Sequence, residues 1–126
     1  MVTIAAIIFT ILISIVIVFQ IGLVIGMPWG EYAMGGRFTG TYPWKMRLGS
    51  MIQIVILFFF AFIVLLRAGI IRSRYDGFSI TAIWLVVGFL VLSVVLNFIT
   101  PSKKERAIWG PISILLLVTS LIVAFQ

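Results

Sequence analysis

The sequence predicts an all-α integral membrane protein, built as a bundle of four transmembrane helices. Four apolar runs cover residues 3–26, 48–70, 79–99 and 107–125. Each run is close to the roughly 20 residues that a helix needs to cross the hydrocarbon of a bilayer. Hydrophobic residues make up 63% of the 126 residues and charged residues only 10%, and no long polar stretch separates the runs. We therefore expect residues 1–126 to form a single transmembrane domain.

The first run begins at the N-terminus, but it lacks the basic start and the small-residue cleavage site of a signal peptide. We expect it to be retained as the first helix. Gly22, Gly26 and Gly30 follow one another at a spacing of four, which in membranes lets helix backbones approach closely. This pattern predicts helix packing, and the alternative is a hinge beside Pro28.

The first connector, residues 27–47, is rich in aromatic side chains and glycine, and reads MPWGEYAMGGRFTGTYPWKMR. Trp and Tyr prefer the headgroup level of a membrane, and Gly and Pro favour turns. A connector with this composition is not expected to extend freely into water. We expect it to lie in the interface, or to fold back as a short re-entrant element that caps the bundle.

The remaining runs are bounded by short polar connectors. The second run, 48–70, is apolar all round and rich in Phe, which is compatible with a lipid-exposed helix. A second connector covers 72–78, and the third run stops before Pro101 because proline disfavours helical geometry in the residue before it. The third connector is 101–106, and Pro111 fits an early position of the fourth helix.

The distribution of basic residues predicts how the protein faces the membrane. With four spans, the first and third connectors lie on one side, and the second connector lies on the other side with both termini. The positive-inside rule places the first and third connectors in the cytoplasm and both termini outside the inner (plasma) membrane. A bias of this size is also compatible with insertion in both orientations. The basic residues are Arg37, Lys45, Arg47, Lys103, Lys104 and Arg106 on the first side, against Arg67, Arg72 and Arg74 on the other.

Three carboxamide side chains lie inside the predicted spans at similar depth. Gln20, Gln53 and Asn97 each lie within roughly 10 Å of the end that bears the first and third connectors, at 1.5 Å of helix rise per residue. Ser93 is one turn from Asn97 on the same helix face. An amide in hydrocarbon is unfavourable without a partner. The three amides therefore either bond to one another between helices or form the floor of a polar vestibule.

Charged and aromatic groups surround this floor in the two connectors. The first connector contributes Glu31 and Arg37, and the third contributes Glu105 and Arg106. For Glu31 we expect either an ion pair or a site that binds a cation or proton. Lys103 and Lys104 are better explained as topology signals and lipid-phosphate contacts. Three tryptophans are expected to frame the vestibule: Trp29, Trp44 and Trp109.

The composition also argues against several classes of function. The chain has no Cys and no His, and its three acidic residues lie in three different connectors, so neither a metal nor another cofactor is expected. The net charge of +6 comes without a basic stripe or reader motif, which argues against nucleic acid. Ser102 and Lys103 are adjacent in a basic connector, which is weak evidence for catalysis. We therefore favour a non-enzymatic protein.

Two blocks of the sequence, GMPWGEYAMGGRFTGTYPWKMR and NFITPSKKERAIWGP, resemble those of a group of small four-span bacterial membrane proteins. The resemblance covers the whole chain, and it implies the fold and the membrane location. No activity is established for that group, so it assigns no site residue.

Two functions fit these observations. The first is a membrane protein that binds or moves a small solute, ion or lipid through a polar vestibule at the end bearing the first and third connectors. The alternative is a structural or accessory subunit that packs against another membrane protein or a second copy of itself. A hydrated cavity that reaches the three amides would favour the first function, and amides that bond to one another would remove its main support.

Overall fold

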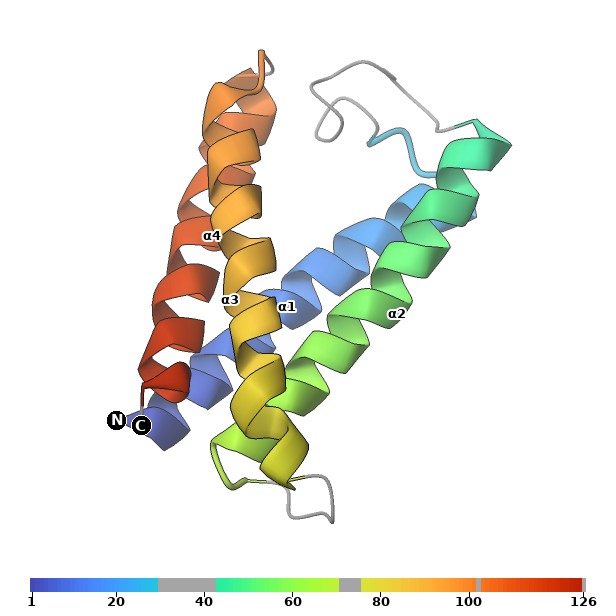
Figure 1. The fold of residues 1–126 in the computed structure, drawn as a ribbon. Coiled ribbons are helices and arrows are strands. Elements are labelled where there is room, and N and C mark those ends of the chain that lie inside the picture. Colours follow the sequence, from blue (N-terminus) through green and yellow to red (C-terminus); the bar gives the residue numbers. More distant parts are fainter. Residues whose placement is uncertain (30–42, 71–75, 102, 126) are drawn as a thin grey trace.

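Four antiparallel helices form the computed structural model of this protein, which describes residues 1–29, 43–70, 76–101 and 103–125 (Figure 1). All four helices are long and apolar enough to cross a membrane. The all-α fold is therefore confirmed, and the chain is a multi-pass membrane protein. The helices are α1 (Val2–Ile25), α2 (Trp44–Arg67), α3 (Asp76–Ile99) and α4 (Lys103–Ala124).

The helices pack in a ring, in which α1 and α3 each contact both α2 and α4. Figure 1 shows that the α1–α2 hairpin and the α3–α4 hairpin converge at the end that holds both termini. They diverge at the opposite end, where α1 leads toward α2 and α3 leads into α4. We call these the closed end and the polar end.

The tightly packed core lies toward the closed end. Phe9 at the start of α1, Ile63 near the end of α2, Ile83 near the start of α3 and Val123 near the end of α4 are almost fully buried. In a bilayer, packing rather than exclusion of water holds such helices together. The complementary fit of these side chains is therefore the main contribution that the closed end makes to stability.

Several hydroxyl side chains within the helices donate hydrogen bonds to carbonyl groups of their own helix. Thr119 Oγ1 donates to the Leu115 carbonyl at 2.8 Å, and Thr10 Oγ1 donates to the Ala6 carbonyl at 2.8 Å. Bonds to a carbonyl one turn earlier are the usual solution for Ser and Thr inside helices. These residues can therefore lie in hydrocarbon, or in a packed interface, without a partner from another helix.

The outer surface is apolar on all four helices. Ile4, Val55, Leu85 and Leu115 are exposed large apolar side chains from α1, α2, α3 and α4 in turn. Contiguous exposed apolar surface of this extent marks a face that meets lipid rather than water. The bilayer expected as the environment of the chain fits this surface.

Several helix boundaries differ from those predicted. Helix α2 begins at Trp44 rather than at 48, α3 begins at Asp76 rather than at 79, and α4 begins at Lys103 rather than at 107. The prediction followed the apolar runs, whereas backbone hydrogen bonding continues into the polar interface. Lys, Glu and Arg are good helix formers, so most of the third connector becomes the first turn of α4. In addition, α2 ends at Arg67 rather than at 70.

The prediction that Pro111 occupies an early helical position is wrong. Because α4 begins at Lys103, Pro111 lies inside the helix, and its missing N–H leaves the Ala107 carbonyl without its usual donor. The preceding Gly110 is buried, and a Cβ there would lie 3.2 Å from the Phe98 ring. This glycine lets α3 and α4 approach closely at this level.

The glycines at the end of α1 have local roles in the described part of the chain. Gly26 ends α1 with a φ of 98°, the left-handed conformation that favours glycine at a helix C-terminus. A Cβ on Gly22 would overlap the Trp29 ring, which folds back over the helix. The neighbour of Gly22 is thus an aromatic ring, rather than the second helix backbone that the spacing predicts. Gly30 lies outside the described residues, as does the predicted cap formed by the first connector.

Candidate functional site

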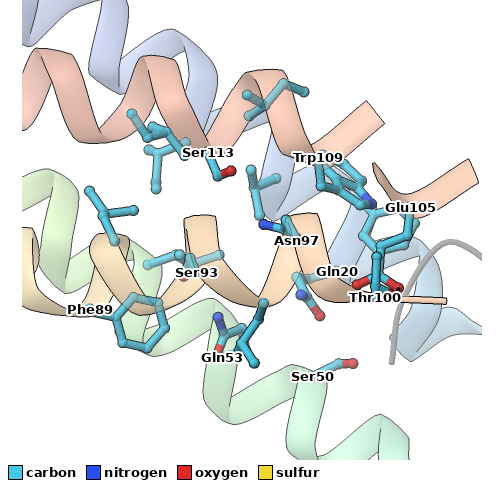
Figure 2. A pocket seen from close by; sticks show the side chains of 18 of the residues that line it. Gln20, Ser50, Gln53, Phe89, Ser93, Asn97, Thr100, Glu105, Trp109 and Ser113 are labelled. Atoms are coloured by element: carbon cyan, nitrogen blue, oxygen red, sulfur yellow. Dashed lines mark hydrogen bonds between the residues drawn. The ribbon is translucent and has the colours of Figure 1, made fainter. Parts of the chain in front are cut away.

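A cavity of about 810 Å³ lies between the four helices in the half of the bundle toward the polar end (Figure 2). All four helices contribute to its wall. Its volume lies within the roughly 300–1,000 Å³ that ligand sites in proteins usually enclose. The cavity occupies the region in which the sequence predicts a vestibule.

The three carboxamides predicted for the vestibule floor all line this cavity. Gln20 comes from α1, Gln53 from α2 and Asn97 from α3, and each side chain is half-buried (Figure 2). Among the described residues, no hydrogen bond joins these amides to one another. The interhelical hydrogen bonds considered as the alternative are therefore absent from this part of the chain, and the amide groups face the cavity instead.

Four hydroxyl groups extend the polar lining. Ser50, Ser93, Thr100 and Ser113 all line the cavity, and Ser113 also donates to the Gly110 carbonyl at 2.8 Å. Of these, only Ser93 was singled out from the sequence. Ser50 precedes Gln53 by three residues, which places both on one helix face. The same spacing argument that linked Ser93 to Asn97 could have found Ser50.

Glu105 brings a carboxyl group to the cavity wall. Its side chain is only 9% exposed, and its Oε2 accepts a hydrogen bond of 3.1 Å from Thr100 Oγ1. This bond joins the end of α3 to the first turn of α4, where the helix dipole favours an acidic side chain. The dipole of α4 and the hydrogen bond from Thr100 therefore both stabilise the position of the Glu105 carboxyl group. It was predicted to belong to the vestibule, and it does line the cavity.

The rotation of α4 places Glu105 on the helix face that lines the cavity. Glu105 shares a helix face with Trp109, Ile112 and Leu116, which all line the cavity at spacings of three and four. The basic residues of the same turn lie off this face, and none of them is part of the cavity wall. Lys103 and Lys104 are exposed and Arg106 is half-buried.

The aromatic frame forms only in part. Trp109 lies in the cavity wall and packs against Phe19 with ring centroids 4.7 Å apart. Trp29 also stacks on Phe19, with ring centroids 6.1 Å apart. Trp44 does not line the cavity; it is exposed in the first turn of α2, with the Lys45 ammonium 5.7 Å from its ring. It thus fits an interfacial anchor better than a wall of the site.

The polarity of the cavity changes along its length. Gln20, Asn97 and Glu105 lie toward the polar end, whereas Phe89 belongs to an inner end with an apolar wall (Figure 2). The lining residues that lie farther from the polar end along their helices are also apolar: Ile13, Leu57, Leu90 and Leu116. The site therefore offers hydrogen-bonding groups at one end and a hydrocarbon-like surface at the other.

The polar groups that line this site can donate and accept hydrogen bonds. Within the described ranges, no group of three or more His, Cys, Asp or Glu side chains could hold a metal ion. The described wall contains one carboxyl group, three carboxamides and four hydroxyls, and no basic side chain. Glu31 and Arg37, also predicted to belong to the site, lie outside the described residues.

Comparisons with protein-family models, with curated proteins and with solved structures find no match to this chain. The resemblance to small four-span bacterial membrane proteins remains an expectation.

Proposed function

We propose that this protein is a non-enzymatic membrane protein that binds or moves a small solute, ion or lipid in the cavity at its polar end. The observation that carries the proposal is the arrangement of Gln20, Gln53 and Asn97. Three carboxamides from three helices face one cavity without bonding to one another in the described structure. A polar group removed from water without a partner costs about 1–3 kcal/mol, so water or a ligand is the expected partner.

The proposal includes the orientation and the location of the protein. The excess of basic residues in the first and third connectors favours a cytoplasmic polar end, with both termini outside. A bacterial inner membrane is the expected location. The cavity would then open toward the cytoplasmic leaflet, and its contents would come from the cytoplasm or from that leaflet.

A second candidate function is an accessory role, in which α1 packs against another membrane protein or a second copy of this chain. It is supported by a shallow groove on the outward face of α1, where Thr10 and Ser14 lie between larger side chains. Small residues at a spacing of four favour close helix contact in membranes. A stable complex in mild detergent, lost when Ser14 is replaced by Leu, would support this role.

Cysteine labelling tests whether the cavity is hydrated, because the natural chain contains no Cys. Gln53→Cys and Asn97→Cys place a thiol in the cavity. Val55→Cys and Val95→Cys place a thiol two residues away on the same helices, where the native side chains are 69% and 49% exposed on the outer surface. A thiol in hydrocarbon stays protonated and unreactive, so we expect the cavity thiols to react with a charged methanethiosulfonate at least about tenfold faster.

Equal, slow labelling of all four variants would refute the proposed vestibule. The same reagent also tests orientation. Applied to inside-out vesicles it should reach Gln53→Cys directly, and applied to right-side-out vesicles it should not. The opposite result would place the polar end outside the cytoplasm, without affecting the argument for the cavity.

A further inference from the structure

Several polar groups of the cavity wall lie well inside the membrane-spanning part of the chain (Figure 2). Gln53 lies seven residues from Met46, the lining residue of α2 closest to the polar end. Ser93 lies six residues from Ile99, the last lining residue within α3. At 1.5 Å of rise per residue, both lie at a depth of about 9–10 Å. The outer surface at the same level is apolar, since the adjacent Ile52 is exposed. The wall therefore offers hydrogen-bonding groups at a depth where the lipid offers none.

Two hydroxyl groups of the wall differ from others in the apolar spans. Thr119 and Ser120 on α4 each donate to a carbonyl of their own helix at 2.8 Å. A hydroxyl inside a helix usually bonds to a carbonyl about one turn earlier in this way. Ser50 and Ser93 line the cavity, and within the described helices neither makes such a bond, although Ser50 is only 5% exposed. The donors of these two hydroxyls are therefore left for a partner in the cavity.

Carboxamides and hydroxyls share the property that each both donates and accepts hydrogen bonds. A carboxamide has two donor hydrogens and an acceptor oxygen, and a hydroxyl has one donor and two acceptor lone pairs. An ammonium group only donates and a carboxylate only accepts, so either would leave part of this wall unmatched. A ligand hydroxyl matches both kinds of group. The wall residues with this property include Gln20, Ser50, Gln53, Ser93 and Asn97.

The positions of these groups favour a ligand with several hydroxyls. Gln20, Gln53 and Asn97 come from three different helices, so a ligand with hydroxyls on adjacent carbons can reach more than one of them. A buried donor or acceptor without a partner is unfavourable, and one hydroxyl cannot satisfy three amides. Phe19 and Trp109 add an apolar aromatic surface to the wall, which suits the C–H groups of such a ligand.

We propose that the cavity takes an uncharged polyhydroxyl group of the glycerol type, held by the carboxamides and hydroxyls of its wall. This inference rests on the proposed ligand-binding function of the cavity and names its ligand class. The match does not depend on the charge of Glu105, which accepts a hydrogen bond from Thr100 near the start of α4. Two sources present the same chemistry: a free polyol from water, and the headgroup of a monoacylglycerol from the surrounding leaflet.

Protection of a thiol in the cavity wall tests this proposal. Ile112→Cys places the thiol on α4, a helix that contributes none of the three amides. Lys103→Cys is the control, because Lys103 is exposed and does not line the cavity. Both are studied in phosphatidylcholine nanodiscs, where buffer reaches both faces of the protein, with a charged methanethiosulfonate as reagent. Leu116→Cys, also in the wall, replaces Ile112→Cys if circular dichroism shows that the latter does not fold.

Glycerol is the probe, and two compounds of similar size separate its hydrogen-bonding properties. We expect glycerol to slow modification of Ile112→Cys by at least about fivefold at its plateau, because the bound form shields the thiol. The compound 1,2,3-trimethoxypropane keeps the oxygen acceptors without a donor, and propylammonium has donors without an acceptor. Neither should slow the reaction by more than about twofold at equal concentration. Lys103→Cys should react at the same rate with each compound.

Removal of individual wall groups should weaken this protection. In the Ile112→Cys background, Gln53→Leu and Ser93→Ala should each reduce the protection by glycerol to less than about twofold. Ser14→Ala is the control, because Ser14 lies on the exposed face of α1 and bonds to the Thr10 carbonyl. It should leave the protection unchanged. In a second arm, 1-monooleoylglycerol is added to the nanodisc in place of glycerol, and its dimethyl ether is the reference.

Protection by glycerol supports a free polyol, and protection by the monoacylglycerol alone supports a headgroup from the leaflet. Equal protection by trimethoxypropane or propylammonium rejects the polyhydroxyl class, and unchanged protection in Gln53→Leu and Ser93→Ala rejects the assigned wall groups. If Ile112→Cys reacts rapidly but no compound protects it, the polyhydroxyl ligand is rejected and the hydrated vestibule stands. If Ile112→Cys reacts as slowly as Val55→Cys on the outer surface, the vestibule is rejected as well.

Discussion

The close contact between Gly22 and Trp29 gives a sharp prediction about the α1 side of the cavity. Replacement of Gly22 by Ala adds a single methyl group, and this Cβ would overlap the Trp29 ring. Gly49→Ala and Gly88→Ala add the same methyl group to helices α2 and α3, where nothing lies within 4 Å. The three substitutions share the gain in helix propensity, so their difference isolates the contact with Trp29.

The size of the effect follows from two contributions. Overpacking a close contact typically costs about 1–3 kcal/mol. Displacement of Trp29 also weakens its stacking on Phe19, which has an interplanar angle of 9° and belongs to a class of contact worth about 0.5–1.5 kcal/mol. The gain of up to about 1 kcal/mol from replacing Gly by Ala in a helix is common to all three variants, so it cancels in the comparison. We expect Gly22→Ala to be less stable than either control by about 1–4 kcal/mol.

Equilibrium unfolding in mixtures of mild detergent and dodecyl sulfate, followed by circular dichroism, measures this difference. A Trp29→Ala background provides the decisive comparison, because it removes the ring that the new methyl group would meet. In that background, Gly22→Ala should no longer be destabilising relative to Gly22. If Gly22→Ala matches the two controls in the natural background, or if Trp29→Ala does not relieve its effect, the ring does not lie over Gly22 as described.

A further prediction concerns the hydrogen bond between Thr100 and the carboxyl group of Glu105 in the cavity wall. Thr100→Val removes the 3.1 Å hydrogen bond to Glu105 and should lower the unfolding free energy by about 0.5–1.5 kcal/mol. Thr81→Val, at an exposed site on α3, should change the unfolding free energy little. If the two variants lower the unfolding free energy equally, the hydrogen bond between Thr100 and Glu105 does not contribute to stability.

The sequence was sufficient to predict which polar groups share a depth in the membrane. A helix rises by a fixed distance per residue, so the positions of Gln20, Gln53 and Asn97 relative to the ends of their runs place them at one level. Their inward direction follows from the cost of exposing an amide to hydrocarbon. The gathering of these three side chains in one cavity could therefore be anticipated without a structure.

The rotation and the exact start of each helix were harder to predict. Glu105 was assigned to a connector, because hydropathy marks the hydrocarbon boundary and not the first turn of a helix. Once α4 begins at Lys103, the spacing of Glu105, Trp109 and Ile112 identifies the face that lines the cavity. Trp44 was also assigned to a connector and was expected to frame the vestibule. It belongs instead to the first turn of α2, where its side chain is exposed.

The contacts between side chains of different helices could not be predicted from the sequence. Phe19 and Trp109 lie 90 residues apart, and nothing in either segment specifies that their rings meet. The glycines of α1 gave a pattern typical of helix contact, yet Trp29 occupies the space beside Gly22. Contacts of this kind depend on which side chain occupies a given place in the folded structure. The pattern of a single sequence does not contain that information.

The distribution of side-chain volume explains why a cavity persists in a bundle that could otherwise close. At the polar end, the rings of Phe19 and Trp109 pack against each other between α1 and α4. On α2, the cavity is lined at the same end by the small residues Gly49 and Ser50, which occupy little of the space between the helices. Small residues usually bring membrane helices together, but among the described residues the three amides of the wall do not bond to one another across this space. The room left beside them is what a bound solute or water would occupy.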